Sequence, residues 1–354
     1  MKEFQKVDKV FIKSNNTVSK IINRYLYCLI PFILFIIIYN LIWGSTTIII
    51  SLLKNIIISF ITSIIIEYLF NLKNKKQKIS KLILENQILT ISFIIGLFSL
   101  NISIPIIIIA SAITTIIKNL TKTNSIYATL YGILFLIISK YFQNTLDTPL
   151  NNLANLSYQG TYESILLPYG NLLDYILGTT TNYLSPILSI ISFIYLFHKK
   201  SIKYNIVFSY ILTITFIMLS LGILNNMNIW YLLFQLTTGN LLFLSVFILP
   251  DYKITPTTEE GQRIYGIILA ILTCILRFIL PELSVIITLI LGPILLTKLL
   301  NNISFKDKEI YLLLPVLGYL VQAFFNISVI EVAPIFYICL GLLISRKKVD
   351  LKRI

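Results

Sequence analysis

Charged residues are scarce in this chain, because only 12% of its 354 residues are Asp, Glu, Lys or Arg. Soluble globular domains carry about a quarter. The hydrophobic share is 56% and the mean hydropathy is +0.86, which is more apolar surface than a soluble core can bury. The composition therefore excludes an ordinary soluble protein and indicates that most of the chain lies in a lipid bilayer.

Metal-binding residues are also few. The three cysteines, Cys28, Cys274 and Cys339, lie in apolar stretches without Cys-x-x-Cys spacing, so we expect buried free thiols and no metal or iron–sulfur site. The single histidine, His198, ends an apolar stretch beside two lysines, which favours an interfacial anchor over a ligand. The motifs GxGxxG, GxxxxGK[ST], HExxH and GxSxG are absent as well, so any chemistry must come through a bound cofactor or an ion path.

Long blocks rich in Ile and Leu fill the rest of the chain, and about 17 to 25 apolar residues span a bilayer as a helix. We predict an all-α, polytopic transmembrane helical bundle of about 10–12 helices. The first block follows a basic tail and lacks a small-residue cleavage site, so we expect it to remain as an anchor. The clearest spans are 25–43, 46–69, 125–141, 183–197, 204–224, 230–249 and 265–280; shorter or interrupted ones are 88–100, 104–117, 283–300, 310–325 and 328–344.

Basic residues give the chain a net charge of +14, and their placement argues for topology and against nucleic acid binding. Lys and Arg gather before the first span and recur after every second span, whereas the connections between those points have none. This alternation follows the positive-inside rule, so we predict a multi-pass plasma-membrane protein with both termini in the cytoplasm. The basic clusters lie within 2–24, 73–81, 199–203, 253–263, 306–308 and 346–353; the connections without them are 101–103, 225–228 and 281–282.

The same alternation places residues 143–182 outside, a stretch that contains no Lys or Arg. A loop of this length is uncommon unless it is functional or disordered, and its apolar residues indicate packing on the outer surface. The predicted organisation is a cytoplasmic tail (1–24), a first transmembrane half (25–142), an external loop (143–182), a second transmembrane half (183–300) and a helical extension with a basic tail (301–354).

Four cations fall within or at the ends of apolar spans: Lys54, Lys118, Lys140 and Arg277. Intramembrane charges mark ion paths, but Lys54, Lys140 and Arg277 lie near outer span ends, where snorkelling to the interface is the simpler explanation. Lys118 lies at an inner end and fits either role. We therefore treat Lys118 and Arg277 as ion-path or structural candidates.

Two Pro-interrupted apolar segments, 100–120 and 280–300, occupy comparable positions in the two halves. Paired broken segments are typical of an inverted repeat with a central site. Because the sequence is of low complexity, chance similarity is the alternative explanation.

The segment LTTGNLLFLSVFILPDYKITPTTEEGQRIYGIILAILTCILRF, at 236–278, resembles the RnfD membrane protein of Rnf electron-transport complexes and its relative NqrB, from the sodium-pumping NADH:quinone reductase. The family pattern has a Leu-[Ser/Thr]-Gly turn in a helix, an Asp-Pro-Val-Thr-Ser-Pro-like loop, Gly-x-Arg and an Ile-[Tyr/Phe]-Gly helix start. The resemblance spans residues 10–300. Its counterparts here are Thr238, Gly239, Phe247, Asp251, Thr255, Pro256, Gly261, Arg263, Ile264 to Gly266, Arg277, Pro281 and Glu282, with Glu85, Asn86, Pro105, Lys118, Asn119 and Leu120 upstream.

Departures from the family concern its flavin chemistry. After the lysine the family has Gly-Gly-x-Gly-x-Asn-x-Phe-Asn-Pro-Ala, and this chain has TKTNSIYATLYG, which keeps only Asn124 and Gly132. The resemblance implies covalent FMN, attached as a phosphoester to the last Thr of a Ser-Gly-Ala-Thr-like run. The matching residue is Thr148, but Leu146 and Asp147 precede it. Leu146 removes the room that small residues leave for the flavin ring and the modifying enzyme, and Asp147 puts a negative charge beside the incoming phosphate. The alternative is that Thr148 simply begins a turn before Pro149.

A second, non-covalent flavin is a further expectation, with cofactor-binding candidates Thr238, Gly239, Asp251, Thr255 and Arg263. The polar loop from Asp251 to Arg263 precedes a helix start and suits a flavin phosphate or a docking subunit. The alternative is a capped helix start, with Thr257 or Thr258 and Glu260 satisfying the first turn.

The resemblance implies a membrane subunit of an Rnf-type complex, an ion-translocating oxidoreductase in which flavins pass electrons while Na+ or H+ crosses the membrane. Other membrane and peripheral subunits would be its partners. Two alternatives remain open: a small-solute transporter or channel with a related helical fold, and a flavin-less scaffold subunit of the same complex.

Overall fold

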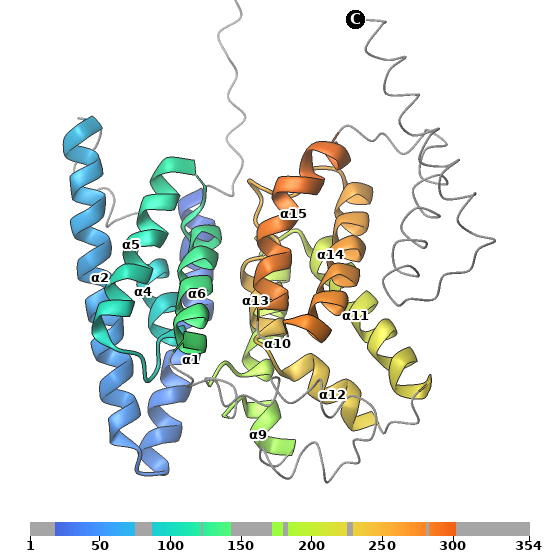
Figure 1. The fold of residues 1–354 in the computed structure, drawn as a ribbon, viewed down its shortest axis with the longest axis horizontal. Helices are drawn as coiled ribbons and strands as arrows, with labels where there is room; N and C mark the ends of the chain where they lie inside the picture. The colour runs from blue at the N-terminus through green and yellow to red at the C-terminus, as the bar shows by residue number, and fades with distance from the viewer. Residues whose placement is uncertain are drawn as a thin grey trace, which may run out of the picture. The chain divides into compact units, whose positions relative to one another are not determined.

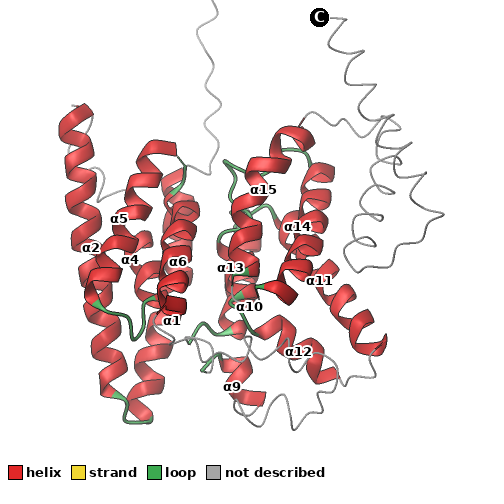
Figure 2. Cartoon of the chain, in the orientation of Figure 1, coloured by secondary structure: helices red, strands yellow, loops and turns green. Residues whose placement is uncertain are grey.

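The computed structural model describes residues 18–74, 87–121, 123–142, 172–179, 183–224, 229–280 and 283–301. All regular secondary structure in these ranges is α-helix (Figures 1 and 2). Among these helices, five are long and apolar enough to cross a membrane: Val18–Ile42, Thr46–Phe70, Ile104–Thr121, Tyr204–Leu224 and Glu259–Ile279. The prediction of an all-α polytopic membrane fold is therefore confirmed. The expected spans 310–325 and 328–344 and Cys339 lie outside the described residues.

The chain divides into two compact units. Unit 1 comprises residues 1–139 and 182–202, and unit 2 comprises residues 140–181 and 203–354. The domain boundaries and the inverted repeat expected from the sequence stay predictions.

Unit 1 is built around α2, which packs against both α4 and α5, while α1 contacts α2, α4 and α10. Two glycines allow these helices to approach closely, as is common between membrane helices. A Cβ on Gly96 would overlap Ile56 of α2, and a Cβ on Gly132 would lie 3.0 Å from the carbonyl oxygen of Ala110. The described helices of unit 1 are α1 (Val18–Ile42), α2 (Thr46–Asn74), α4 (Gln87–Phe98), α5 (Ile104–Thr121), most of α6 (Ser125–Phe142) and α10 (Pro186–His198).

Unit 2 centres on α14, which packs against α11 and α15. Gly266 brings α14 against the backbone of α11, because a Cβ there would lie 2.6 Å from the Ile206 carbonyl oxygen. The described helices of this unit are α9 (Leu172–Leu177), α11 (Tyr204–Leu224), α12 (Ile229–Thr237), α13 (Leu241–Phe247), α14 (Glu259–Ile279) and α15 (Ser284–Asn301).

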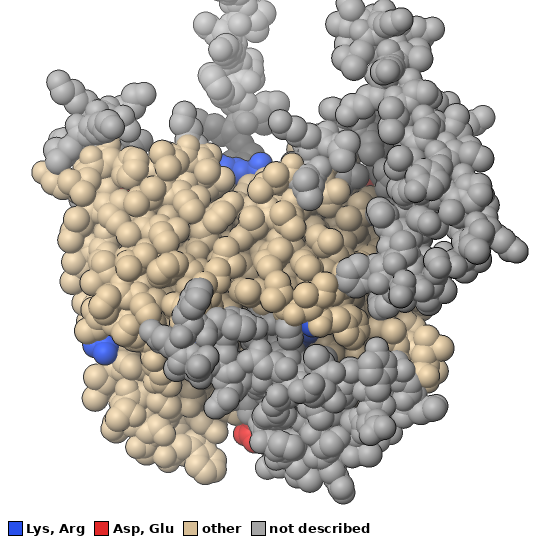
Figure 3. Space-filling view, viewed as in Figure 1, with Lys and Arg blue, Asp and Glu red and all other residues tan. Residues whose placement is uncertain are grey.

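The described surface is largely apolar, and few charged side chains are visible on the face in Figure 3. On α2 the exposed side chains include Ile57, Ile61 and Ile65, with exposed fractions of 57%, 50% and 52%. In water such a stripe would be an aggregation hazard. In a bilayer it is the lipid-facing side of the helix.

The prediction of one continuous helix at 230–249 is wrong, because the structure has two short helices there. Gly239 and Asn240 adopt positive φ values of 69° and 55° between α12 and α13. No α-helix continues through that conformation, and glycine is the residue that tolerates it best. The turn falls where the family pattern has its Leu-[Ser/Thr]-Gly element.

The two Pro-containing segments also differ from each other. Pro105 is the second residue of α5, where proline leaves no helical hydrogen bond unmade, so segment 100–120 contains an uninterrupted helix. Pro293 lies inside α15. The expectation that both segments are interrupted by proline is therefore wrong for the first one.

Candidate functional site

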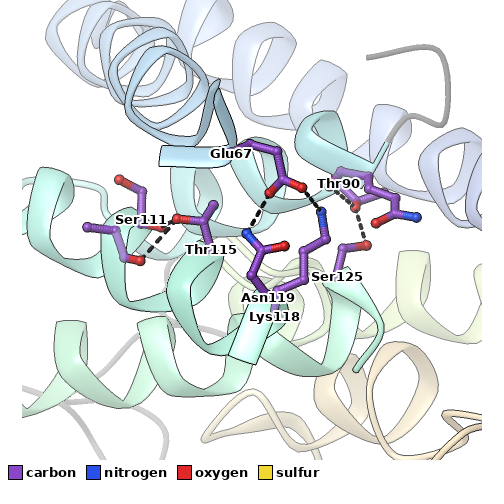
Figure 4. A network of polar contacts seen from close by, with 9 residues as sticks. Glu67, Thr90, Ser111, Thr115, Lys118, Asn119 and Ser125 are labelled. Carbon is purple, nitrogen blue, oxygen red and sulfur yellow. Dashed lines mark hydrogen bonds and ion pairs between the residues drawn. The ribbon is translucent and has the colours of Figure 1, made fainter. Parts of the chain in front are cut away.

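A buried ion pair joins two helices of unit 1. Lys118 of α5 places its Nζ 3.3 Å from Oε1 of Glu67 on α2, and both side chains are at least nine-tenths buried. The Asn119 side chain donates a 2.9 Å hydrogen bond to Oε2 of the same carboxylate (Figure 4). Lys118 therefore points into the protein and not toward an interface.

Each buried charge of this pair depends on the other for its stability in unit 1. Each charge alone would be costly to desolvate, and removing one partner of a buried pair leaves the other uncompensated. Ionisable side chains at membrane depth are rare and usually pair with one another. Among the described residues of unit 1, the pair is therefore the strongest candidate for an ion-path or structural charge.

Glu67 ends a stripe of buried polar residues along α2. Asn55, Ser59, Ser63 and Glu67 are spaced four apart, which places them on one face of the helix, and all are buried. The Asn55 amide donates to the Ser99 carbonyl at 2.7 Å, and the Ser59 hydroxyl donates to the Ser92 carbonyl at 3.3 Å. This stripe was not predicted from the sequence, although its four-residue spacing within an Ile-rich span was a readable signal.

In unit 2 the described structure brings together two of the predicted site residues. Arg277 of α14 is 2% exposed, and its Nη2 donates to the carbonyl oxygen of Thr238 at 2.8 Å and to the Thr238 hydroxyl at 3.1 Å. A cation at the carbonyl end of a helix is favourable, so Arg277 stabilises the end of α12. The expectation that Arg277 snorkels to the interface is therefore wrong.

The loop from Asp251 to Arg263 is held by a residue that was not among the predicted site residues. Lys203, just before α11, donates from Nζ to the carbonyl oxygens of Tyr252, Thr255 and Pro256 at 3.0–3.2 Å and to the Thr255 hydroxyl at 2.9 Å. Burial lowers the pKa of Lys203, and the nearby Asp251 carboxylate partly offsets that effect. The lysine cross-links the loop to the start of α11.

The end of this loop is a capped helix start. The Thr258 hydroxyl accepts a 3.2 Å hydrogen bond from the Gly261 N–H, and Glu259 and Glu260 occupy the first turn of α14. Carboxylates there complement the helix dipole but repel an incoming phosphate. The geometry supports the capping alternative and gives no support to a flavin phosphate at this helix start.

The candidate flavin residues fall into two groups. Thr238 and Gly239 precede α13, whereas Asp251, Thr255 and the exposed Arg263 follow it. The 7 residues of α13 separate the groups by about 10 Å along the helix axis. They do not form one compact phosphate site.

Comparison with known protein families identifies the family of this chain. The family model described as the NQR2, RnfD, RnfE family matches residues 6–303. The chain belongs to this family. No individual curated protein matches it.

Membership of the NQR2/RnfD/RnfE family confirms the resemblance seen in the sequence and makes the chain a membrane subunit of Rnf/Nqr-type multi-subunit, ion-translocating complexes. Several elements of the family pattern have a structural role here. The Thr-Gly turn separates α12 from α13, Arg277 binds that turn, and Gly266 sets the approach of α14 to α11. Thr148 lies outside the described residues, so its flavin attachment stays a prediction.

Replacing Lys203 by Met is expected to loosen the loop of this family member. One hydrogen bond to a charged group contributes about 1.5 kcal/mol or more, so amide exchange at residues 252–256 should rise about tenfold or more. Hydrogen–deuterium exchange with mass spectrometry measures this rate. Lys253→Met, which changes an exposed side chain of the same loop, is the control, and equal exchange in the two variants would show that Lys203 does not hold the loop.

Proposed function

We propose that this family member helps to move electrons between flavin centres of an Rnf-like complex while the assembly translocates Na+ or H+. The family match over residues 6–303 carries the proposal. The buried Glu67–Lys118 pair supports it, because intramembrane ionisable residues are typical of ion paths. The chain itself would oxidise neither NADH nor ferredoxin, since its sequence has no nucleotide-binding or cluster motif.

The proposed attachment site for covalent FMN is the Thr148 hydroxyl, which would bear the flavin phosphate as an ester. FMN supplies the redox chemistry, and the protein controls the position of the flavin relative to the next carrier. The Thr148-Pro149-Leu150 sequence supports this assignment, and Leu146 and Asp147 count against it.

The proposed topology places the protein in the plasma membrane with both termini and the Asp251 to Arg263 loop in the cytoplasm, and Thr148 outside. The distribution of Lys and Arg supports this orientation. In this arrangement the covalent flavin lies on the outer side, and the exposed Arg263 is available to a cytoplasmic partner protein.

Intact-protein mass spectrometry after co-expression with a flavin transferase tests the proposal. We expect the wild-type chain to carry the added mass of one FMN, and Thr148→Ala to lose it, because the ester needs the hydroxyl oxygen. Thr145→Ala, three residues earlier in the same loop, should retain the flavin. An unmodified wild-type mass together with no visible flavin spectrum would contradict the assignment.

One observation favours a second candidate function. The broken helix α12–α13 is also typical of small-solute transporters. A colourless purified protein that moves solute into liposomes would support that function. A colourless protein without flux that still co-purifies with the other subunits would indicate the flavin-less scaffold.

A further inference from the structure

The two faces of α2 differ completely in character. Ile57, Ile61 and Ile65 are at least half exposed and face lipid. Asn55, Ser59 and Ser63 alternate with them at an offset of two residues, which turns them by about 200° around the helix axis, toward α4 and α5. A helix that only anchored the protein would not need this buried polar face.

Two atoms on the buried face have unmet hydrogen-bonding capacity. Within the described part of the chain, Asn55 Oδ1 and Ser63 Oγ have no hydrogen-bond partner. Leaving such a group unsatisfied costs about 1–3 kcal/mol. Native proteins usually avoid this cost with ordered internal water, which makes about three hydrogen bonds to buried polar groups.

The ion pair adds a donor to the same face. Ser63 lies one helical turn before Glu67, and the Lys118 ammonium, although 3.3 Å from that carboxylate, makes no aligned hydrogen bond in the described structure. At most one of its three hydrogens faces that carboxylate, so at least two are available to water. A donor at Lys118 and an acceptor at Ser63 are what a bridging water needs.

We propose that α2, α4 and α5 enclose a track of internal water molecules that runs from Asn55 to the Glu67–Lys118 pair. From residue 55 to residue 67 the helix rises by about 18 Å, so the track would extend over more than half of the bilayer's hydrocarbon thickness of about 30 Å. Asn55 bonds the Ser99 carbonyl in the turn that contains the exposed Asn101. Water enters at this turn and reaches the Glu67 carboxylate through the track.

The competing arrangement is a dry interface in which polar side chains only join the helices. Ser59 fits that arrangement, because its hydroxyl already bonds the Ser92 carbonyl, and Thr62 fits it through its hydrogen bond with Ser111. Asn55 and Ser63 distinguish the two arrangements. The water track does not depend on flavin binding, so the mass-spectrometry test can fail without affecting it.

Cysteine accessibility in membranes containing the full chain tests the track. In a background with Cys28, Cys274 and Cys339 replaced by Ala, single cysteines are introduced as Asn55→Cys and Ser63→Cys, with Ile57→Cys, Ile61→Cys and Ile65→Cys as lipid-facing controls. The probe is methanethiosulfonate ethylammonium, with Ag+ as a smaller second probe. Both react with the thiolate, which forms only where water reaches the sulfur.

We expect the cysteines at 55 and 63 to react at least about tenfold faster than those at 57, 61 and 65. Ser59 lies between Asn55 and Ser63 on the same helix face, so water in the track would also reach a cysteine there. Ser59→Cys therefore replaces either position whose variant fails to assemble. Equal or slower reaction at the track positions with both probes would overturn the proposal and establish a dry interface.

Discussion

Replacing Lys118 by Met is expected to destabilise the folded protein by about 3–5 kcal/mol, because the Glu67 carboxylate would stay buried without its cation. The methionine preserves most of the side-chain length, so packing loss contributes little. Equilibrium unfolding of the purified chain in mixed micelles of increasing SDS content measures the change. Lys54→Met, which removes an exposed cation from α2, should change the free energy of unfolding by less than about 0.5 kcal/mol.

The double variant Lys118→Met/Glu67→Gln separates the ion pair from other effects. Neutralising both partners removes the uncompensated charge, so we expect the double variant to be more stable than Lys118→Met alone. The coupling energy of the double-mutant cycle should exceed about 1 kcal/mol, as for residues in direct contact. Strict additivity of the two single changes would show that the charges do not interact.

The sequence predicted the helices of this protein better than their contacts. The span 204–224 coincides with α11, and the predicted start of α2 at residue 46 is also correct, because apolar length and polar breaks are local properties. The role of Lys118 was left ambiguous, since its partner is on a different helix. Only the packing of α2 against α5 brings Glu67 to it.

Arg277 shows a similar limit of prediction from sequence. The family resemblance identified both Arg277 and Thr238, but proximity to a span end suggested snorkelling. The broken helix reverses this interpretation, because the turn exposes a carbonyl oxygen inside unit 2 that the guanidinium binds at 2.8 Å. Lys203 was missed for the same reason, since the loop that it holds begins almost fifty residues later in the chain.

The packing of α14 against α11 gives a physical reason for the glycine at position 266. Its Cα faces α11, where an added Cβ would overlap the Ser209 hydroxyl and lie 2.6 Å from the Ile206 carbonyl oxygen. The hydroxyl can rotate away, but the carbonyl belongs to a helix backbone and cannot. The close approach of α11 and α14 therefore depends on the absence of a side chain at this position.

Gly266→Ala is accordingly expected to destabilise unit 2 by about 1–3 kcal/mol through overpacking, after allowance for the helix propensity that alanine adds. Gly222→Ala on α11 is the control for helix propensity, because its added Cβ would meet only the Tyr231 ring at 3.4 Å, an ordinary contact. Alanine is favoured over glycine in a helix by about 1 kcal/mol in both variants, so their difference in SDS unfolding isolates the steric cost. If the two variants are equally stable, α11 and α14 can separate without loss, and the glycine contact does not fix their packing.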